Sequence, residues 1–221
     1  LPMDQEVFIK AYFKGLAGKL APFGYEPNQL IDTIWKGTSA MIQNDGSRLN
    51  EDLFWEVFAN IYGPKGLEDK IHIDNFYSTD FQRVKDACGF APESEQLIHS
   101  LKEKNYRVIL ATNPIFPKVA TYSRIRWCNL SPEDFEIITT YDNCHFCKPN
   151  PKYYEEILKN AGLTPEECLM VGNDVDEDMI AQSLGMNVFL LTDCIINKHD
   201  KDISCYPHGS FDELRSYLES I

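Results

Sequence analysis

Apolar side chains recur at helical spacing through the first ninety residues of the chain. The clearest stripes cover residues 4–20 and 53–61, where apolar positions follow one another at intervals of three and four. A third stripe covers residues 27–43 and ends in the turn-forming sequence Asn-Asp-Gly-Ser, and a weaker one covers residues 67–87. This half shows no alternation typical of a strand. We therefore predict a helical region over residues 1–90.

From residue 91 onward, short apolar runs alternate with amphipathic segments. The predicted strands cover residues 107–111, 135–139, 168–171 and 187–191. The predicted helices cover residues 94–104, 117–128, 151–161, 175–184 and 210–218. Short apolar strands separated by helices imply parallel pairing, with helices on both faces of the sheet. The pattern predicts an α/β fold with a doubly wound parallel sheet over residues 91–221, preceded by a separate helical domain over residues 1–90.

Composition narrows the class of protein. The 221 residues are 43% hydrophobic and 25% charged, which is typical of a globular protein, and no apolar run is long enough to span a membrane. The net charge of −13 disfavours nucleic acid as a partner. The seven cysteines are an odd number, which favours free thiols in the cytoplasm. Cys144-His145-Phe146-Cys147 has no second ligand pair at zinc-site spacing, so we interpret its cysteines as loop thiols.

Three of the predicted strands are followed by residues that carry chemistry. Thr112 and Asn113 follow the first strand, Lys148 lies in the loop after the second, and Asp174 and Asp178 follow the third. Ligands of open α/β sheets bind beyond the carboxyl ends of the strands, so these side chains are expected at one end of the sheet.

Each of these residues also has a purely structural interpretation. Thr112 is of a type common in turns, and Lys148 is compatible with a solvated loop. Asp174 and Asp178 could form the acidic first turn of a helix, where the helix dipole favours carboxylates. Three aspartates and a glutamate within five residues nevertheless repel one another, and a divalent cation would relieve that repulsion.

Together, these motifs resemble the haloacid dehalogenase superfamily, which consists mostly of magnesium-dependent phosphatases. Val-Ile-Leu-Ala-Thr112 is similar to the second motif of that family, an apolar strand ending in Thr or Ser. Lys148-Pro149 matches the third, and the Asp174 to Asp178 spacing after a buried strand matches the fourth. A small-residue helix running into Gly185 also resembles the family.

The resemblance implies a phosphatase that uses Mg²⁺ and acts on a small phosphorylated metabolite. It implies that Asp174 binds the metal directly, while Asp178 orients waters or Lys148. It further implies that Lys148 neutralises the nucleophile and the phosphoryl group, to which Thr112 and Asn113 donate hydrogen bonds. The helical region over residues 1–90 would then be a cap that closes over the substrate.

One family motif is missing from the sequence. No Asp-x-Asp-x-Thr occurs, although that motif supplies the nucleophile and the general acid/base of the family's phosphatases. The opening Leu1-Pro2-Met3-Asp4 resembles the stretch that follows the motif, so we expect the nucleophile upstream of Leu1. The alternatives are a catalytically silent binding or regulatory protein, and a dehalogenase or phosphomutase on the same scaffold. A nucleotide-binding domain is disfavoured because no Gly-x-Gly-x-x-Gly or P-loop is present.

Overall fold

The computed structural model describes residues 2–220 and divides into two compact units, Leu1–Phe146 and Cys147–Ile221. The predicted boundary at residue 90 lies inside the first unit, so the division into cap and core stays a prediction. No helix within residues 2–220 is long and apolar enough to cross a membrane.

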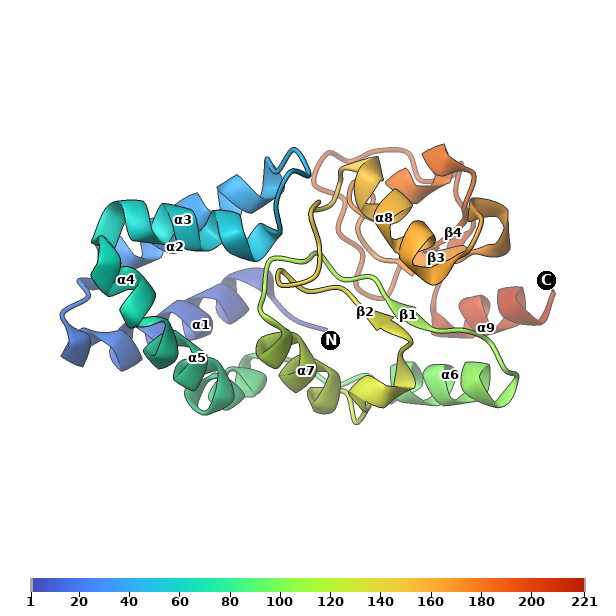
Figure 1. Cartoon of the computed structure of the whole chain (residues 1–221). Coiled ribbons are helices and arrows are strands. Elements are labelled where there is room, and N and C mark those ends of the chain that lie inside the picture. The colour runs from blue at the N-terminus through green and yellow to red at the C-terminus, as the bar shows by residue number, and fades with distance from the viewer. Residues whose placement is uncertain (1, 221) are drawn as a thin grey trace. The chain divides into compact units, whose positions relative to one another are not determined.

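Helices make up most of the first unit (Figure 1). In chain order its elements are α1 (Gln5–Leu20), η1 (Ala21–Phe23), α2 (Pro27–Ile42), α3 (Asn50–Tyr62), α4 (Pro64–Glu68), α5 (Lys70–Ser78), η2 (Asp80–Ala87), α6 (Pro92–Glu103), β1 (Ile109–Leu110), α7 (Lys118–Trp127), η3 (Pro132–Asp134) and β2 (Ile137–Ile138). The helices predicted over residues 4–20, 27–43, 53–61, 94–104 and 117–128 are all confirmed.

The weak helical stripe over residues 67–87 is interrupted, which corrects the prediction of one continuous stretch. Thr79 leaves helical geometry at φ −123° and ψ −77°, and its hydroxyl donates to the Asn75 carbonyl at 2.7 Å. The segment is divided at Asp69 and Thr79, so it forms α4, α5 and the 3₁₀ helix η2.

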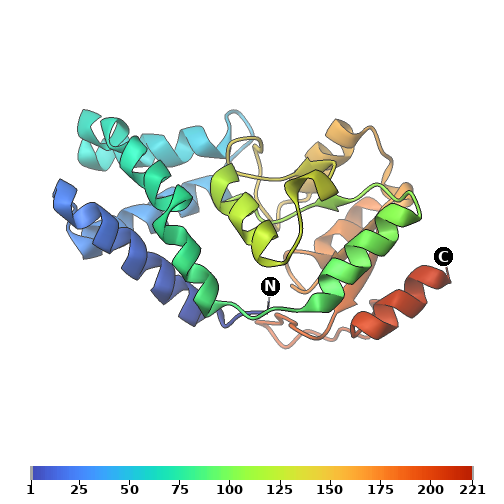
Figure 2. The ribbon, with the colours of Figure 1, turned by 90° about the horizontal axis from the view of Figure 1, so that it is seen from below.

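Aromatic side chains fill the core of the helical part. Helix α1 lies against α5 and η2 (Figure 2), where Phe76 and Phe81 are fully buried. Five further aromatics of this region are buried: Tyr12, Phe13, Phe54, Trp55 and Phe58. Trp35 of α2, by contrast, is 48% exposed.

Strands β1 and β2 form a short parallel ladder joined through α7. Ile109 pairs with Ile137 and Leu110 pairs with Ile138. Both residues of β1 are only partly buried, and within residues 2–220 β1 pairs with β2 alone. One edge of β1 is therefore left without a strand partner in the described part of the chain.

The second unit carries a three-stranded parallel sheet in the order β3-β4-β5. Its elements are α8 (Pro151–Ala161), η4 (Pro165–Glu167), β3 (Leu169–Gly172), η5 (Met179–Leu184), β4 (Asn187–Leu191), β5 (His208–Gly209) and α9 (Phe211–Glu219). Strand β4 is central and buried from Val188 to Leu191, whereas Val171 of β3 is 37% exposed. In residues 2–220, β3 pairs with β4 only. The predicted α/β class with parallel strands is confirmed, and within residues 2–220 the strands form one two-stranded and one three-stranded ladder.

Candidate active site

An acidic loop follows the carboxyl end of β3, at Asn173 to Asp178. A helix was predicted from Val175, and this prediction is wrong: the loop is a turn, and only the 3₁₀ helix η5 follows. The Asp174 carboxylate binds backbone N–H groups of the loop. Its Oδ1 accepts hydrogen bonds from the N–H groups of Asp176 and Glu177, at 2.9 Å each. Short acidic side chains that bind nearby N–H groups compete with helix formation.

The segment after β4 holds this loop in place. The Ile196 N–H donates to the Asn173 carbonyl at 2.8 Å, and the Val175 N–H donates to the Ile196 carbonyl at 3.0 Å. The Asn173 side-chain amide adds a bond to the Cys194 carbonyl at 2.6 Å. The loop is thus fixed by backbone pairing on both sides of Asp174.

Asp174 is a buried carboxylate, 8% exposed, whose two oxygens differ in their partners. Oδ1 is occupied by the two loop N–H groups. No hydrogen bond from residues 2–220 reaches the second oxygen, Oδ2. Asp174 therefore keeps one oxygen that can bind a cation.

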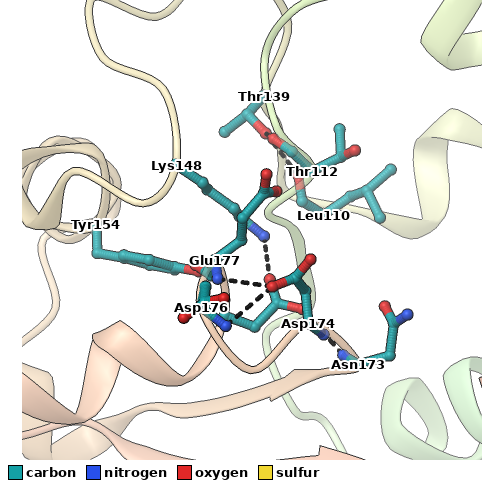
Figure 3. Close-up of polar contacts among 10 residues, drawn as sticks. Leu110, Thr112, Thr139, Lys148, Tyr154, Asn173, Asp174, Asp176 and Glu177 are labelled. Atoms are coloured by element: carbon teal, nitrogen blue, oxygen red, sulfur yellow. Dashed lines mark hydrogen bonds and ion pairs between the residues drawn. The ribbon is translucent and has the colours of Figure 1, made fainter. Parts of the chain in front are cut away.

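Asp178 is fully engaged by protein groups. Its Oδ1 lies 2.5 Å from Lys148 Nζ, and both side chains are less than a tenth exposed. Its Oδ2 accepts the N–H groups of Asn173 and Asp174 at 2.9 and 3.0 Å. Figure 3 shows the lysine ammonium reaching toward the acidic loop from the segment that precedes α8. A buried ion pair of this kind is stable only when its remaining polar atoms are bonded, as they are at Asp178.

Gly172 makes the position of Asp178 possible. A Cβ at residue 172 would lie 2.2 to 2.3 Å from atoms of the Asp178 side chain, well inside van der Waals contact. The last residue of β3 must therefore lack a side chain for Asp178 to fold back over the strand end.

Two tyrosines of α8 enclose the lysine. Lys148 Nζ lies 5.7 Å from the ring centres of both Tyr153 and Tyr154, which are buried. The Tyr154 hydroxyl donates to the Glu177 carbonyl at 2.9 Å. Burial raises the pKa of Tyr154, and the nearby carboxylates raise it further, so this hydroxyl stays a donor at any physiological pH.

Thr112 and Asn113 belong to the first unit, in the loop that follows β1. The Thr112 carbonyl accepts a bond of 2.7 Å from the hydroxyl of Thr139, which is 1% exposed. The same hydroxyl lies 3.2 Å from the Leu110 carbonyl (Figure 3). Thr139, directly after β2, therefore holds the backbone at the end of β1 in place.

The structure brings together three of the five predicted site residues, namely Lys148, Asp174 and Asp178. The expectation that Thr112 and Asn113 share a pocket with them stays a prediction. Sequence reasoning missed Gly172, Tyr154 and Thr139. The glycine directly after the third predicted strand was a usable signal, whereas neither Tyr154 nor Thr139 stands out in the sequence.

Both cysteines of the Cys144-His145-Phe146-Cys147 motif are buried. The seven cysteines all lie among the described residues, and none of them is part of a disulfide. Residues 2–220 contain no cluster of three or more His, Cys, Asp or Glu side chains able to hold a metal by themselves. An ion bound at Asp174 would therefore take its other ligands from water or substrate.

A known protein family matches most of the chain. The model of the haloacid dehalogenase-like hydrolases matches residues 16–183.

Curated relatives are similar over shorter regions. A glyceraldehyde 3-phosphate phosphatase of Methanothermobacter thermautotrophicus is 31% identical over 101 residues, which cover 45% of this chain and 43% of that protein. The pyrophosphatase PpaX of Bacillus cereus is 27% identical over 90 residues, covering 41% and 40%. The aligned region thus spans less than half the length of either relative.

Solved structures share the fold over nearly the whole chain. A 2-haloacid dehalogenase from Pseudomonas syringae pv. Tomato superposes with a TM-score of 0.61 at 18% identity, covering 97% of this chain and 91% of that one. A phosphatase from Thermococcus onnurineus gives 0.57 at 17% identity, covering 99% and 93%. At these identities the likeness concerns the fold alone.

Proposed function

Because the chain belongs to the haloacid dehalogenase-like hydrolases, we propose that the complete protein is a Mg²⁺-dependent phosphatase. It hydrolyses a small phosphorylated metabolite through an aspartyl-phosphate intermediate. Its nucleophile is an aspartate upstream of Leu1, since the sequence carries no Asp-x-Asp-x-Thr.

The observation that carries the proposal is the buried group of Lys148, Asp174 and Asp178 at the carboxyl end of β3. A phosphate monoester is an anion, and an attacking carboxylate is another. Their repulsion falls when cationic groups lie beside both. Lys148 is a cation held in a fixed direction by Asp178, at 2.5 Å, in a site that excludes most water.

The donor chemistry of Asp174 fits Mg²⁺. This ion prefers oxygen ligands, keeps several waters and uses one or two carboxylates, so a single buried carboxylate with one uncommitted oxygen suits it. Asp178 fits the role of direct ligand less well, because Lys148 and two N–H groups occupy its oxygens. When bound, Mg²⁺ would supply positive charge to the phosphoryl oxygens.

The remaining roles follow from position in the chain. Lys148 pairs with the phosphoryl oxygens and the nucleophile, and Asp178 orients it. The hydroxyl of Thr112 and the N–H of Asn113 donate to the phosphoryl group. The helical residues 1–90 act as the cap over the substrate.

The name of the Methanothermobacter relative supports a small phosphorylated carbon compound as the substrate class. The odd number of cysteines, seven, supports a reducing compartment, so our proposal includes a cytoplasmic location. Its strong negative charge disfavours nucleic acid.

The decisive experiment compares the chain of residues 1–221 with a chain that also carries the upstream segment of its gene. We expect the extended chain to hydrolyse p-nitrophenyl phosphate with added Mg²⁺. This hydrolysis should stop when EDTA removes the metal. The shorter chain should be inactive. Lys148→Ala in the extended chain should lose activity that extra Mg²⁺ does not restore, because the missing cation is the lysine's own.

Strong turnover by residues 1–221 alone would contradict the proposal. So would an extended chain that releases halide from 2-haloacids without metal and leaves phosphate esters intact, because that result would make the protein a dehalogenase. An extended chain inactive on both substrate classes would favour a binding or regulatory protein.

A further inference from the structure

The Thr139 hydroxyl has no part in the functions considered so far, yet it contacts the loop that carries two predicted phosphate ligands. Thr139 follows β2 and is 1% exposed. Its Oγ1 donates to the Thr112 carbonyl at 2.7 Å, across 27 positions of sequence. Its backbone N–H donates to the Leu110 carbonyl at 3.1 Å, which continues the β1-β2 ladder.

The direction of the Asn113 N–H depends on that bond. The Thr112 carbonyl and the Asn113 N–H belong to one planar trans peptide, so they point in opposite directions. A hydroxyl that draws the carbonyl toward β2 turns the N–H away from β2. Thr139 therefore sets the orientation of a backbone donor without touching anything that this donor binds.

A second buried side chain holds the loop on the other side of Asn113. The Asn50 amide is 0% exposed, and its Nδ2 lies 3.4 Å from the Pro114 carbonyl. Its Oδ1 accepts a bond of 2.9 Å from Asn44 Nδ2, and its backbone N–H donates to the Cys144 carbonyl at 2.9 Å. The peptide between Pro114 and Ile115 is thus tied to Asn50 of α3, while the peptide between Thr112 and Asn113 is tied to Thr139, directly after β2.

We infer that Thr139 is a positioning residue, whose hydroxyl aims the Asn113 N–H at the phosphoryl group, with Asn50 holding the Pro114 carbonyl further along the loop. That the Asn113 N–H binds a phosphoryl group rests on the proposed phosphatase function. That Thr139 sets the direction of this N–H rests on the hydrogen bonds alone. A preorganised donor costs no reorganisation when the anion arrives, and this is how a remote hydroxyl affects binding.

The test uses Thr139→Val, which keeps the shape and removes the hydroxyl, and Thr139→Ser, which restores the hydroxyl. Thr33→Val is a matched control, since Thr33 is also 1% exposed and its hydroxyl also donates to a carbonyl at 2.7 Å, within α2. In the extended chain we expect Thr139→Val to raise KM for p-nitrophenyl phosphate and Ki for inorganic phosphate about 3- to 10-fold, the size of one lost hydrogen bond. The kcat should change less, and Thr139→Ser should recover most of the loss. Thr33→Val should leave KM and Ki unchanged.

A second readout does not depend on activity. In ¹⁵N-labelled protein, Thr139→Val should shift the Asn113 amide resonance and speed its hydrogen exchange, while Thr139→Ser and Thr33→Val leave both near wild type. An unchanged Asn113 amide in Thr139→Val would overturn the inference, even in an active enzyme. Altered Asn113 exchange in a protein without phosphatase activity would uphold the aiming and refute the proposed function. Equal KM effects in Thr139→Val and Thr33→Val would reduce Thr139 to a structural role.

Discussion

At the scale of single residues, Asp174 and Asp178 differ in what surrounds them. Asp178 neutralises a buried lysine, whereas Asp174 binds only N–H groups of its own loop. We expect Asp178→Asn to lower the free energy of unfolding by about 3–5 kcal/mol, because the variant removes the carboxylate that neutralises the buried charge of Lys148. Asp174→Asn should cost much less stability, and in the extended chain it should lower activity in a way that high Mg²⁺ partly restores.

Urea denaturation of both variants, together with rates measured against Mg²⁺ concentration, separates these two roles. If Asp178→Asn shows the larger defect that metal rescues, the assignment of the direct ligand within the pair is reversed. Equal and small losses of stability would indicate that the Lys148–Asp178 pair is solvated in solution.

Gly172 offers a second prediction at this scale. Gly172→Ala places a methyl group against the Asp178 carboxylate, so the side chain or the strand end must move. Such overpacking typically costs about 1–3 kcal/mol. Gly18→Ala is the control, because no atom lies within 4 Å of a Cβ at that exposed position of α1. There the added methyl should stabilise the helix by roughly 0.5–1 kcal/mol, so thermal unfolding should move in opposite directions in the two variants.

At the scale of elements, Asp134 joins η3 to α6 and makes stability depend on pH. Lys102 Nζ at 2.5 Å, and then the Ser131 N–H at 2.8 Å, hold the pKa of Asp134 below its ordinary value of 3.8. Because the pKa of Asp134 is lower in the folded than in the unfolded state, its carboxylate stabilises the fold at pH values above the ordinary pKa. This stabilisation is lost as the pH falls through the lowered pKa of the folded state.

Asp134→Asn should therefore cost about 1 kcal/mol at pH 7, the usual value of a lost cap. The difference from wild type should shrink as the pH falls below 4. Denaturation curves at pH 7 and pH 3 test this, with the exposed Asp86→Asn as a control that changes little at either pH. If Asp134→Asn destabilised the protein as much at pH 3 as at pH 7, the stabilisation by Asp134 would not depend on its charge.

At the scale of the whole molecule, strands β1 and β3 each leave one edge unpaired within residues 2–220. Ile109 and Leu110 are only partly buried, and Val171 is 37% exposed, although such apolar residues suit a covered strand. An upstream strand that pairs with either edge would bury apolar surface and satisfy backbone groups. We expect the extended chain to unfold at a higher temperature than residues 1–221 and to bind less of a dye that reports exposed apolar surface. Identical melting and dye binding in the two chains would argue against pairing at these edges.

The sequence by itself determined the features that depend on local order. Helical periodicity located α1, α2, α3 and α8, because burial of one helix face requires it. The alternation of apolar runs with helices indicated the parallel α/β class. The positions of Lys148 and Asp174 after predicted strands marked the candidate site, and the sharing of that site with Thr112 stays a prediction.

Only the tertiary structure decided how these residues are used. The acidic stretch after β3 has the composition of a first helical turn, yet it forms a loop. Lys148, thirty residues away, binds Asp178, and the carboxylates capture the N–H groups that a helix would need. The aiming of the Asn113 N–H depends on Thr139, which no local pattern connects to it. Hydrogen bonds between distant side chains and backbone groups leave no periodic trace in a sequence, so they become visible only when the chain is folded.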